Sequence, residues 1–267
     1  MADVGAAIRA AGLVGRAVCL HASYRSFGGA AGSPDDLLDA FAREGCTVMV
    51  PTFSWEAHGA TPLQGAPIPA RNGWSPGRAA VRRTAIPFTP ASVALDAHSM
   101  GAVAAAVLRR VDRARGNHPL SSFTATGHSA AAIVGVQDPE DVFTPLAALA
   151  KEGGAVLLAG VGLTTATLLH LAEQAAGRRM FVRWALTREG VIPTRVGGCS
   201  SGFERLARPL APAERRWSCG PSEWRVYDAA RALELVTAAI SADPSITRCP
   251  AAECARCEDA IAGGPEV

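Results

Sequence analysis

Two side chains able to take part in proton transfer, His170 and Glu173, lie three residues apart in the sequence. Residues with this spacing share one face of an α-helix, so both side chains are expected to point the same way. A histidine can accept a proton at neutral pH, and a carboxylate on its other ring nitrogen commonly orients it. Glu204 is a more distant candidate for the orienting role, and Glu173 would then be free to bind a substrate amine. Taken alone, this short segment favours a hydrogen-bonded histidine in the core.

The residues before His170 predict how it would be positioned. An apolar run over 155–159 predicts a buried strand that ends at Gly160-Val-Gly162, and a helix is expected over 167–176. In open α/β sheets, ligands bind in crevices at the carboxyl edge, which the free N–H groups of a following helix face. An amine that attacks a thioester at such an edge must lose a proton as it becomes an amide, and a histidine could take that proton.

Two other segments could approach a ligand. Residues 21–29 (HASYRSFGG) follow an expected first strand, and their small side chains and glycines would let backbone N–H groups reach a phosphate or a pantetheine chain. An ordinary strand-to-helix connection fits them equally well. Residues 117–123 (NHPLSSF) form a polar turn in which Pro119 pushes His118 toward extended geometry. A solvated loop is an equal alternative for this second segment.

A long segment rich in Gly and Pro, residues 55–86, is expected to be an irregular loop, and such loops are usually functional or mobile. Its two tryptophans, Trp55 and Trp74, could form a wall over a ligand or simply cover the core. The core role is slightly favoured.

The seven cysteines suggest a metal only weakly. Cys249, Cys254 and Cys257 have the spacing of half a zinc site, and structural zinc requires four ligands. Cys219 is the only plausible fourth ligand in this interpretation. An odd number of cysteines in a long chain favours reduced thiols, so no metal is expected.

The elements that must hold these residues alternate between short β-like runs and amphipathic helical runs, which indicates an α/β layered fold. No repeat or linker divides the chain, so a single domain is expected over residues 1–267, with an irregular, cysteine-containing tail from residue 243. Ser33 and Pro34 predict the start of a helix over 34–41. A strand pair is expected over 180–187 and 191–196.

Composition excludes several classes of protein. The 26 basic and 24 acidic residues leave a net charge of +2, and no polybasic arm points to nucleic acid. We find no signal pattern and no apolar run as long as a membrane span, so a cytoplasmic protein without a membrane partner is expected. The sequence is compatible with a monomer or a homodimer.

Ordered blocks between His21 and Ile240 resemble the aminoglycoside 3-N-acetyltransferase family, also called the antibiotic N-acetyltransferase family. The blocks are 21–23 (HAS), 44–52 (EGCTVMVPT), 87–90 (PFTP), 99–101 (SMG), 117–127 (NHPLSSFTATG), 144–146 (TPL), 160–162 (GVG) and 170–173 (HLAE). No block is decisive by itself, but their order and spacing extend over most of the chain.

The resemblance implies a mixed β-sheet flanked by helices and direct transfer from acetyl-CoA to an amine. His170 would deprotonate the amine, Glu173 would face the substrate, and Thr167 would lie beside the reacting acetyl group. The implied acceptor is the 3-amino group of a 2-deoxystreptamine aminoglycoside, which would make antibiotic resistance a possible role. The coenzyme site is implied at Ala22, Ser23, Asn117, His118, Ser122 and Phe123.

The chain departs from the family pattern at two places. Family members usually carry a polar series before the histidine, where this chain has residues 164–166 (TTA). Resistance enzymes often carry an acidic run where it has residues 197–202 (GGCSSG). Aminoglycosides are polycations, and a negative field raises their capture rate. Glu56, expected with Trp55 at the substrate, could compensate, as could Asp96 or Glu223.

Two alternatives stay open at this point. One is the same chemistry on a different amine in natural-product metabolism, which the missing acidic run favours. The other is a non-catalytic CoA-binding or zinc-stabilised module, for which the cysteine-containing tail is the only support.

Overall fold

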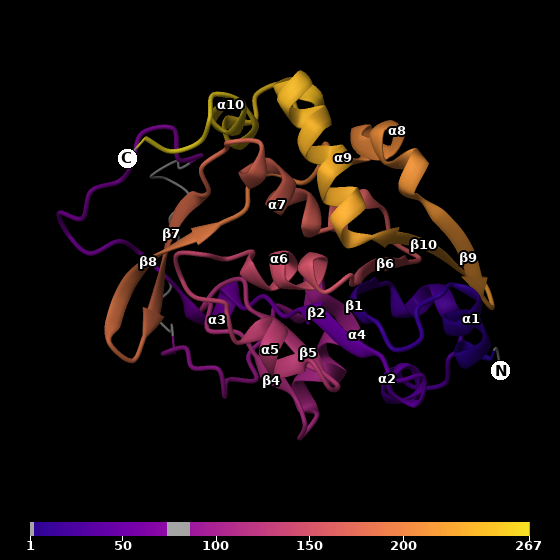
Figure 1. Ribbon diagram of the computed structural model, residues 1–267. Helices are drawn as coiled ribbons and strands as arrows, with labels where there is room; N and C mark the ends of the chain where they lie inside the picture. The colour runs from indigo at the N-terminus through magenta and orange to yellow at the C-terminus, as the bar shows by residue number, and fades with distance from the viewer. Residues whose placement is uncertain (1–2, 74–85, 267) are drawn as a thin grey trace.

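The computed structural model describes residues 3–73 and 86–266, and a mixed seven-stranded sheet lies at its centre (Figure 1). The strand order is β4-β5-β2-β1-β6-β10-β9, and β2, β1 and β6 run parallel while the other pairs are antiparallel. The expectation of an α/β fold with a mixed sheet is therefore confirmed. The strands are β1 (Ala17–Ala22), β2 (Thr47–Pro51), β4 (Ala114–Arg115), β5 (Phe123–Thr126), β6 (Ala155–Ala159), β9 (Arg215–Cys219) and β10 (Ser222–Asp228).

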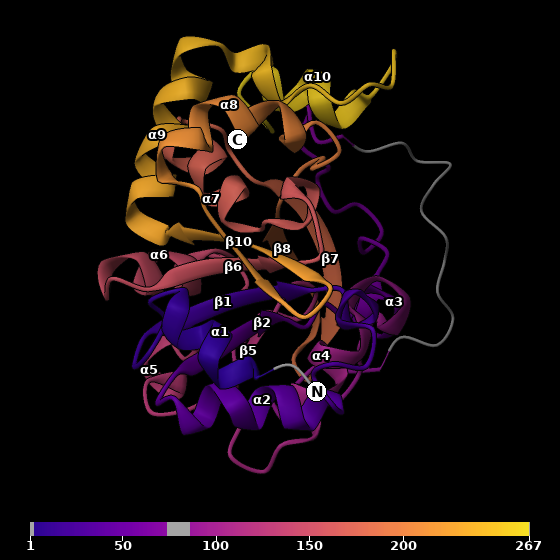
Figure 2. The same ribbon diagram turned by 90° about the vertical axis from the view of Figure 1, so that its right-hand side faces the viewer.

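Helices cover both faces of this sheet, as the two views show (Figures 1 and 2). One face packs against α5 (Ala130–Val134), α6 (Thr144–Lys151), α7 (Leu168–Ala175) and α9 (Ala229–Ala242). The other packs against α1 (Val4–Ala10), α2 (Pro34–Arg43) and α4 (Ala97–Arg109), which has a kink at Gly101. Successive residues of β6 join opposite cores, Val156 on the first face and Leu157 on the second. An entirely apolar strand is what a sheet covered on both faces requires.

A smaller antiparallel sheet contains β3 (Gly59–Ala60), β7 (Phe181–Thr187) and β8 (Gly190–Val196). The predicted pairing of the last two strands is confirmed, with Phe181 opposite Val196. In Figure 1 this hairpin extends to the left of the main sheet. Strand β8 leads into the loop over 197–202, and Gly197 of this loop lies against the His170 ring of α7.

Two segments expected to be irregular are partly ordered. Residues 55–58 form a short helix, α3 (Trp55–His58), because Asp96 accepts hydrogen bonds from the backbone N–H groups of Trp55 and Glu56, both at 2.9 Å. The C-terminal tail contains α10 (Ala255–Ile261) as well as buried cysteines. Both segments are ordered by partners distant in sequence, which local patterns do not reveal.

Local hydrogen bonds determine where helix α2 begins. Ser33 caps α2 as predicted: its hydroxyl accepts from the Asp36 N–H at 3.1 Å, and the Asp36 carboxylate accepts from the Ser33 N–H at 2.7 Å.

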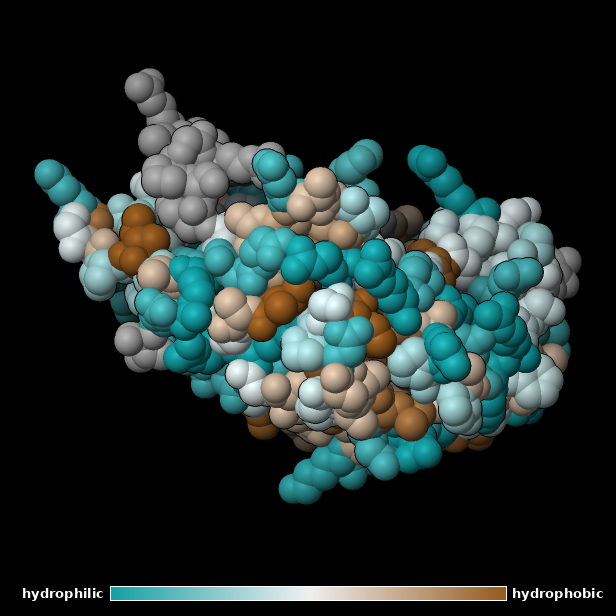
Figure 3. Space-filling model, turned by 90° about the horizontal axis from the view of Figure 1, so that it is seen from above, coloured by the Kyte–Doolittle hydropathy of each residue, from teal (hydrophilic) through white to brown (hydrophobic). Residues whose placement is uncertain are grey.

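The face carrying α8 (Ala207–Leu210), α9 and α10 is mostly hydrophilic, with hydrophobic residues in separate patches (Figure 3). Within the described residues, we find no helix that combines the length and the apolar character needed to cross a bilayer.

The buried Arg115 holds the chain that leaves the end of β2. Its guanidinium donates to the Ser92 carbonyl at 2.7 Å, to the Thr52 carbonyl at 2.8 Å, and to the hydroxyls of Ser122 and Ser54 at 2.9 and 3.1 Å. Burial lowers the pKa of Arg115 to about 10, so the side chain stays cationic at neutral pH. These contacts fix the backbone that enters the functional site.

Replacing Arg115 by Met would leave several buried oxygen atoms without donors. We expect the free energy of unfolding to fall by about 3 kcal/mol or more. The matched control is Arg109→Met, because the Arg109 side chain is 63% exposed and lies 3.8 Å from Asp35. This control should stay within ~0.5 kcal/mol of the parent protein in urea unfolding. Equal unfolding midpoints for the two variants would contradict the role given to Arg115.

Candidate active site

A cavity of about 360 Å³ opens at the carboxyl ends of β1, β2 and β6. This is the sheet edge where a ligand crevice is expected in an α/β fold. Its lining comes from the ends of these strands, from α4, from the turn before α7 and from the loop after β8. The residues are Leu20, His21, Ala22, Val50, Pro51, Phe53, Ser99, Met100, Val103, Ala104, Val161, Thr164, Thr165, Ala166, Thr167, His170 and Ser200.

The turn after β6 carries the chain from the sheet to His170. Gly160 has a φ of +65°, and a Cβ there would lie 2.2 Å from the Ser26 side chain, so only glycine fits this position. The short 3₁₀ helix η3 (Leu163–Thr165) follows, and α7 then begins after Thr167. His170 therefore lies in the first turn of α7, and both it and Thr167 line the cavity.

Glu173 orients the His170 imidazole. Glu173 Oε2 lies 2.7 Å from Nδ1 of His170. Because a carboxylate accepts, Nδ1 carries the proton in this arrangement, and Nε2 is left as the ring atom able to accept one. The His170 side chain is 12% exposed and the Glu173 side chain 4%. The predicted sharing of one helix face is thus present in the structure.

The Glu173 carboxylate is paired a second time, with Arg178. Arg178 also donates to the Thr247 hydroxyl at 2.8 Å and to the Pro244 carbonyl, both in the 3₁₀ helix η6 (Pro244–Thr247). The result is a buried chain of contacts that runs from the imidazole to the C-terminal segment. Arg178 could not be recognised from the sequence, since nothing local distinguishes a buried arginine from an exposed one.

Aromatic rings and one glycine enclose the imidazole. Phe143 stacks on His170 with ring centroids 5.8 Å apart, and Phe203 lies at 4.7 Å with a tilt of 60°. A Cβ at Gly197 would come within 2.9 Å of the ring, so this glycine of the loop after β8 allows a close approach that a side chain would block. The ring is held on three sides while it still borders the cavity.

Glu204 does not orient the His170 imidazole, which was its expected role. Its Oε1 accepts from the Leu163 N–H at 2.5 Å, and its other oxygen lies 3.7 Å from Arg225. The carboxylate on the imidazole is Glu173, so Glu204 supports the η3 turn instead of orienting the base. Glu173 is correspondingly buried between His170 and Arg178, which differs from the expectation that it faces the substrate.

The residues expected to bind coenzyme divide into two groups. Ala22 lines the cavity and Ser23 follows it, with its backbone N–H bonded to the Ala159 carbonyl at 2.9 Å. Ser122 and Phe123 are fully buried: Ser122 accepts from Arg115, and Phe123 packs in the core, so neither side chain faces the cavity. Asn117 is exposed at the surface and is not part of the cavity lining.

His118 is a structural residue, which corrects its expected role as a ligand of the coenzyme. Its Nδ1 accepts from the backbone N–H groups of Leu120 and Ser121 at 3.2 and 2.9 Å. The proton is therefore on Nε2, which donates to the Arg195 carbonyl at 2.7 Å. With both nitrogen atoms satisfied and no exposed surface, His118 joins the turn after β4 to β8.

Trp55 and Glu56, expected at the substrate, lie outside the cavity lining. Trp55 packs against the small cluster that contains Leu120 and Phe181, which is the core role that the sequence slightly favoured. Glu56 is exposed on α3. Trp74 lies outside the described residues. Helix α4 also forms a wall of the cavity, a role not predicted from the sequence, although its residues 99–101 contribute to the resemblance to the family.

An oriented imidazole at the carboxyl edge of a sheet, next to a cavity, defines a candidate enzyme that uses a general base. Comparison with known proteins agrees with this class. A model of the family described as aminoglycoside 3-N-acetyltransferase matches residues 19–240. The chain belongs to this family of acyltransferases.

Individual relatives agree with the family match. Aminoglycoside N(3)-acetyltransferase VII of Streptomyces paromomycinus is 32% identical over 168 residues, which cover 61% of this chain and 55% of the relative. The chain thus matches about half the length of this curated relative. The crystal structure of AAC(3)-Xa has a TM-score of 0.73 at 28% identity and covers 90% of this chain and 91% of its own. A mutant of AAC(3)-IVa in complex with a gentamicin shares the fold, with a TM-score of 0.74 at 22% identity over 98% of this chain and 96% of its own.

Two buried histidines should make stability depend on pH. Burial lowers the pKa of His21 and of His118 to about 4, against an ordinary value near 6.5 in the unfolded chain. The unfolded chain therefore binds more protons between these values, so the stabilisation is complete above pH 6.5 and is lost as the pH falls toward 4. At pH 5 each histidine should lower the free energy of unfolding by about 2 kcal/mol relative to pH 7.5.

Urea unfolding at the two pH values measures this loss. Nitrogen NMR of the histidine rings identifies its source, since both rings should stay neutral at pH 5 in the folded protein. A protonated His118 ring in the folded protein at pH 5 would contradict the assignment.

Proposed function

We propose that this chain transfers the acetyl group of acetyl-CoA directly to the 3-amino group of a 2-deoxystreptamine aminoglycoside, with His170 as general base. The observation that carries the proposal is the hydrogen bond between His170 and the buried Glu173 at the border of the cavity. The family match gives the class of reaction, and the geometry gives a residue that can perform its proton transfer.

In this mechanism the amine nitrogen attacks the thioester carbonyl carbon, and Nε2 of His170 takes the proton that the amine must lose. Glu173 stabilises the imidazolium that forms, because its carboxylate already accepts from Nδ1. Collapse of the tetrahedral intermediate breaks the carbon–sulfur bond, and the proton on His170 passes to the departing CoA thiolate. No net proton is gained or lost by the enzyme in one cycle.

The oxygen of the thioester carbonyl becomes negative in the transition state and needs donors. The Thr167 hydroxyl and backbone N–H groups of the turn near Gly162 are the candidates, since both lie before α7 at the cavity. The Leu163 N–H is already bonded to Glu204, which removes it from this set. For the coenzyme, Ala22 and Ser23 offer backbone at the cavity, and Asn117 offers an exposed polar side chain.

The charge of the residues that line the cavity bears on the choice of acceptor. Among the described residues that line it, none is acidic: the polar ones are the hydroxyls of Ser and Thr and the imidazoles of His21 and His170. The AAC(3)-IVa mutant binds a gentamicin, a fact that supports an aminoglycoside here. A neutral lining favours an acceptor with fewer charges, so N-acetylation of a different amine is the second candidate function.

A thiol-release assay with acetyl-CoA and a panel of aminoglycosides tests the proposal. We expect CoA to be released with at least one member, and His170→Ala should lower kcat by about 10²–10⁴-fold while binding CoA normally in calorimetry. The matched control is His128→Ala, because His128 is exposed and lies outside the cavity lining. Near-normal turnover of His170→Ala would refute the base assignment. Silence across the panel, with acetyl-CoA still bound, would favour the second acceptor.

Glu173→Gln tests the orienting role separately. A glutamine amide can donate to Nδ1 and so stabilise the tautomer in which Nε2 already carries the proton and cannot act as a base. We expect kcat to fall by about 10²-fold or more with little change in KM. Glu152→Gln, at an exposed position after α6, is the control. An unchanged kcat in a folded Glu173→Gln variant would contradict the tautomer argument.

A further inference from the structure

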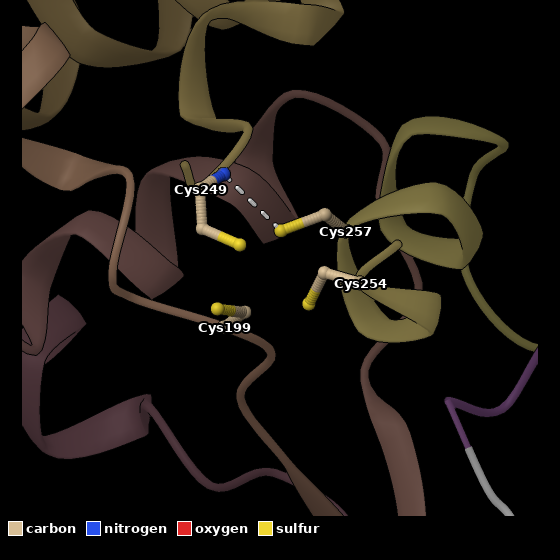
Figure 4. Close-up of side chains that lie close together, drawn as sticks. All are labelled: Cys199, Cys249, Cys254 and Cys257. Atoms are coloured by element: carbon tan, nitrogen blue, oxygen red, sulfur yellow. Dashed lines mark hydrogen bonds between the residues drawn. The ribbon is translucent and has the colours of Figure 1, made fainter. Parts of the chain in front are cut away.

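Four cysteines from distant parts of the chain meet at one point outside the cavity. The Sγ atoms of Cys199, Cys249, Cys254 and Cys257 all lie within 4.8 Å of one another. Figure 4 shows that the four side chains surround a common space. They come from the loop after β8, from the segment after η6 and from the start of α10.

The sulfur atoms lie close enough together to form a tetrahedral metal site. Four thiolates around Zn²⁺ at ~2.3 Å are separated from one another by about 3.8 Å, so a small contraction of the observed cluster suffices. Three of the four cysteines are buried, and Cys254 is partly exposed. A set of four sulfur ligands without an open position is characteristic of structural zinc, and catalytic zinc keeps one position for water.

The backbone around the cluster is also arranged for sulfur ligands. The N–H of Cys249 lies 3.4 Å from Sγ of Cys257, so a donor faces this sulfur as it would face a metal-bound thiolate. The N–H groups of Cys257 and Glu258 both bond to the Cys254 carbonyl, which turns the Cys-x2-Cys segment into the first turn of α10. Arg248 pairs with Glu258 beside the cluster and closes the same turn.

We propose that Cys199, Cys249, Cys254 and Cys257 bind one Zn²⁺ ion as a structural site. Each thiol loses its proton to the solvent on coordination, so binding releases up to four protons. This proposal differs from the expectation that no metal binds. It also differs from the weaker zinc interpretation, in which Cys219 was the plausible fourth ligand. Cys219 ends β9 and packs in the core beneath α1 and α2, apart from the cluster. Cys199 completes the set through the tertiary fold.

The proposed ion would fix the loop that encloses the base. Cys199 lies between Gly197, which approaches the His170 ring, and Phe203, which contacts that ring, and its neighbour Ser200 lines the cavity. Arg178 donates hydrogen bonds to Pro244 and Thr247 of η6, which ends just before Cys249. The metal would therefore join two segments that support His170 and Glu173, without contributing to the chemistry.

Metal analysis of protein purified without chelators tests the site independently of acyl transfer. We expect about one zinc per chain, and less than a tenth of that in Cys254→Ser and in Cys199→Ser. The control Cys219→Ala should keep its zinc, since this thiol is buried in a different cluster. When the protein is produced in cells grown with cobalt, the absorption spectra of the parent protein and of the control should contain a thiolate-to-cobalt charge-transfer band. The spectra of the two serine variants should lack it.

A second measurement covers the case in which the serine variants do not fold. Titration of the folded parent protein with a mercurial thiol reagent should release its zinc in proportion to the cluster thiols modified, and the melting temperature should fall as zinc leaves. The proposal is overturned if the parent protein contains no zinc and takes up none after reduction and supply of Zn²⁺. A disulfide between any two of the four cysteines in freshly purified protein, seen by mass spectrometry, overturns it as well.

Discussion

The hydrogen bond between His170 and Glu173 is the constraint on which the rest of the site depends. A carboxylate whose side chain is only 4% exposed is costly to bury unless its charge is balanced. The spacing of three residues brings one partner, the imidazole, from the same helix face, and Arg178 supplies the balancing charge from beyond the end of α7. Once the carboxylate is buried in this way, the ring orientation and its tautomer are both determined.

This constraint explains why several loops converge on α7. The imidazole needs a surface behind it that leaves one nitrogen at the cavity, and Phe143, Phe203 and Gly197 provide that surface from three separate segments. Glu204 does not touch the ring, but it fixes the Leu163 N–H and with it the turn that starts the helix. Contacts from these separate segments, together with the Glu173 carboxylate, hold the ring in one orientation at the border of the cavity.

The sequence predicted the parts of the structure that are determined locally. The apolar run of β6, the glycine turn and the amphipathic start of α7 were all visible, and so was the cap at Ser33. The roles of His118 and Glu204 could not be predicted in the same way, because each residue makes a hydrogen bond with a backbone group distant in the chain. The short helix α3 was missed for the same reason, since its N-terminus is capped by Asp96 from forty residues later.

The C-terminal segment extends this argument beyond the part of the chain that the family model matches. That match ends at residue 240, whereas Pro244 and Thr247, which accept hydrogen bonds from Arg178, come after it. Arg178 in turn balances Glu173, so residues outside the matched region support the orientation of the His170 imidazole. A chain cut after residue 240 would retain the imidazole and its carboxylate but would lose the groups that hold the compensating arginine. The segment after 240 is therefore part of the support of the candidate active site, even though none of its residues that the structure describes lines the cavity.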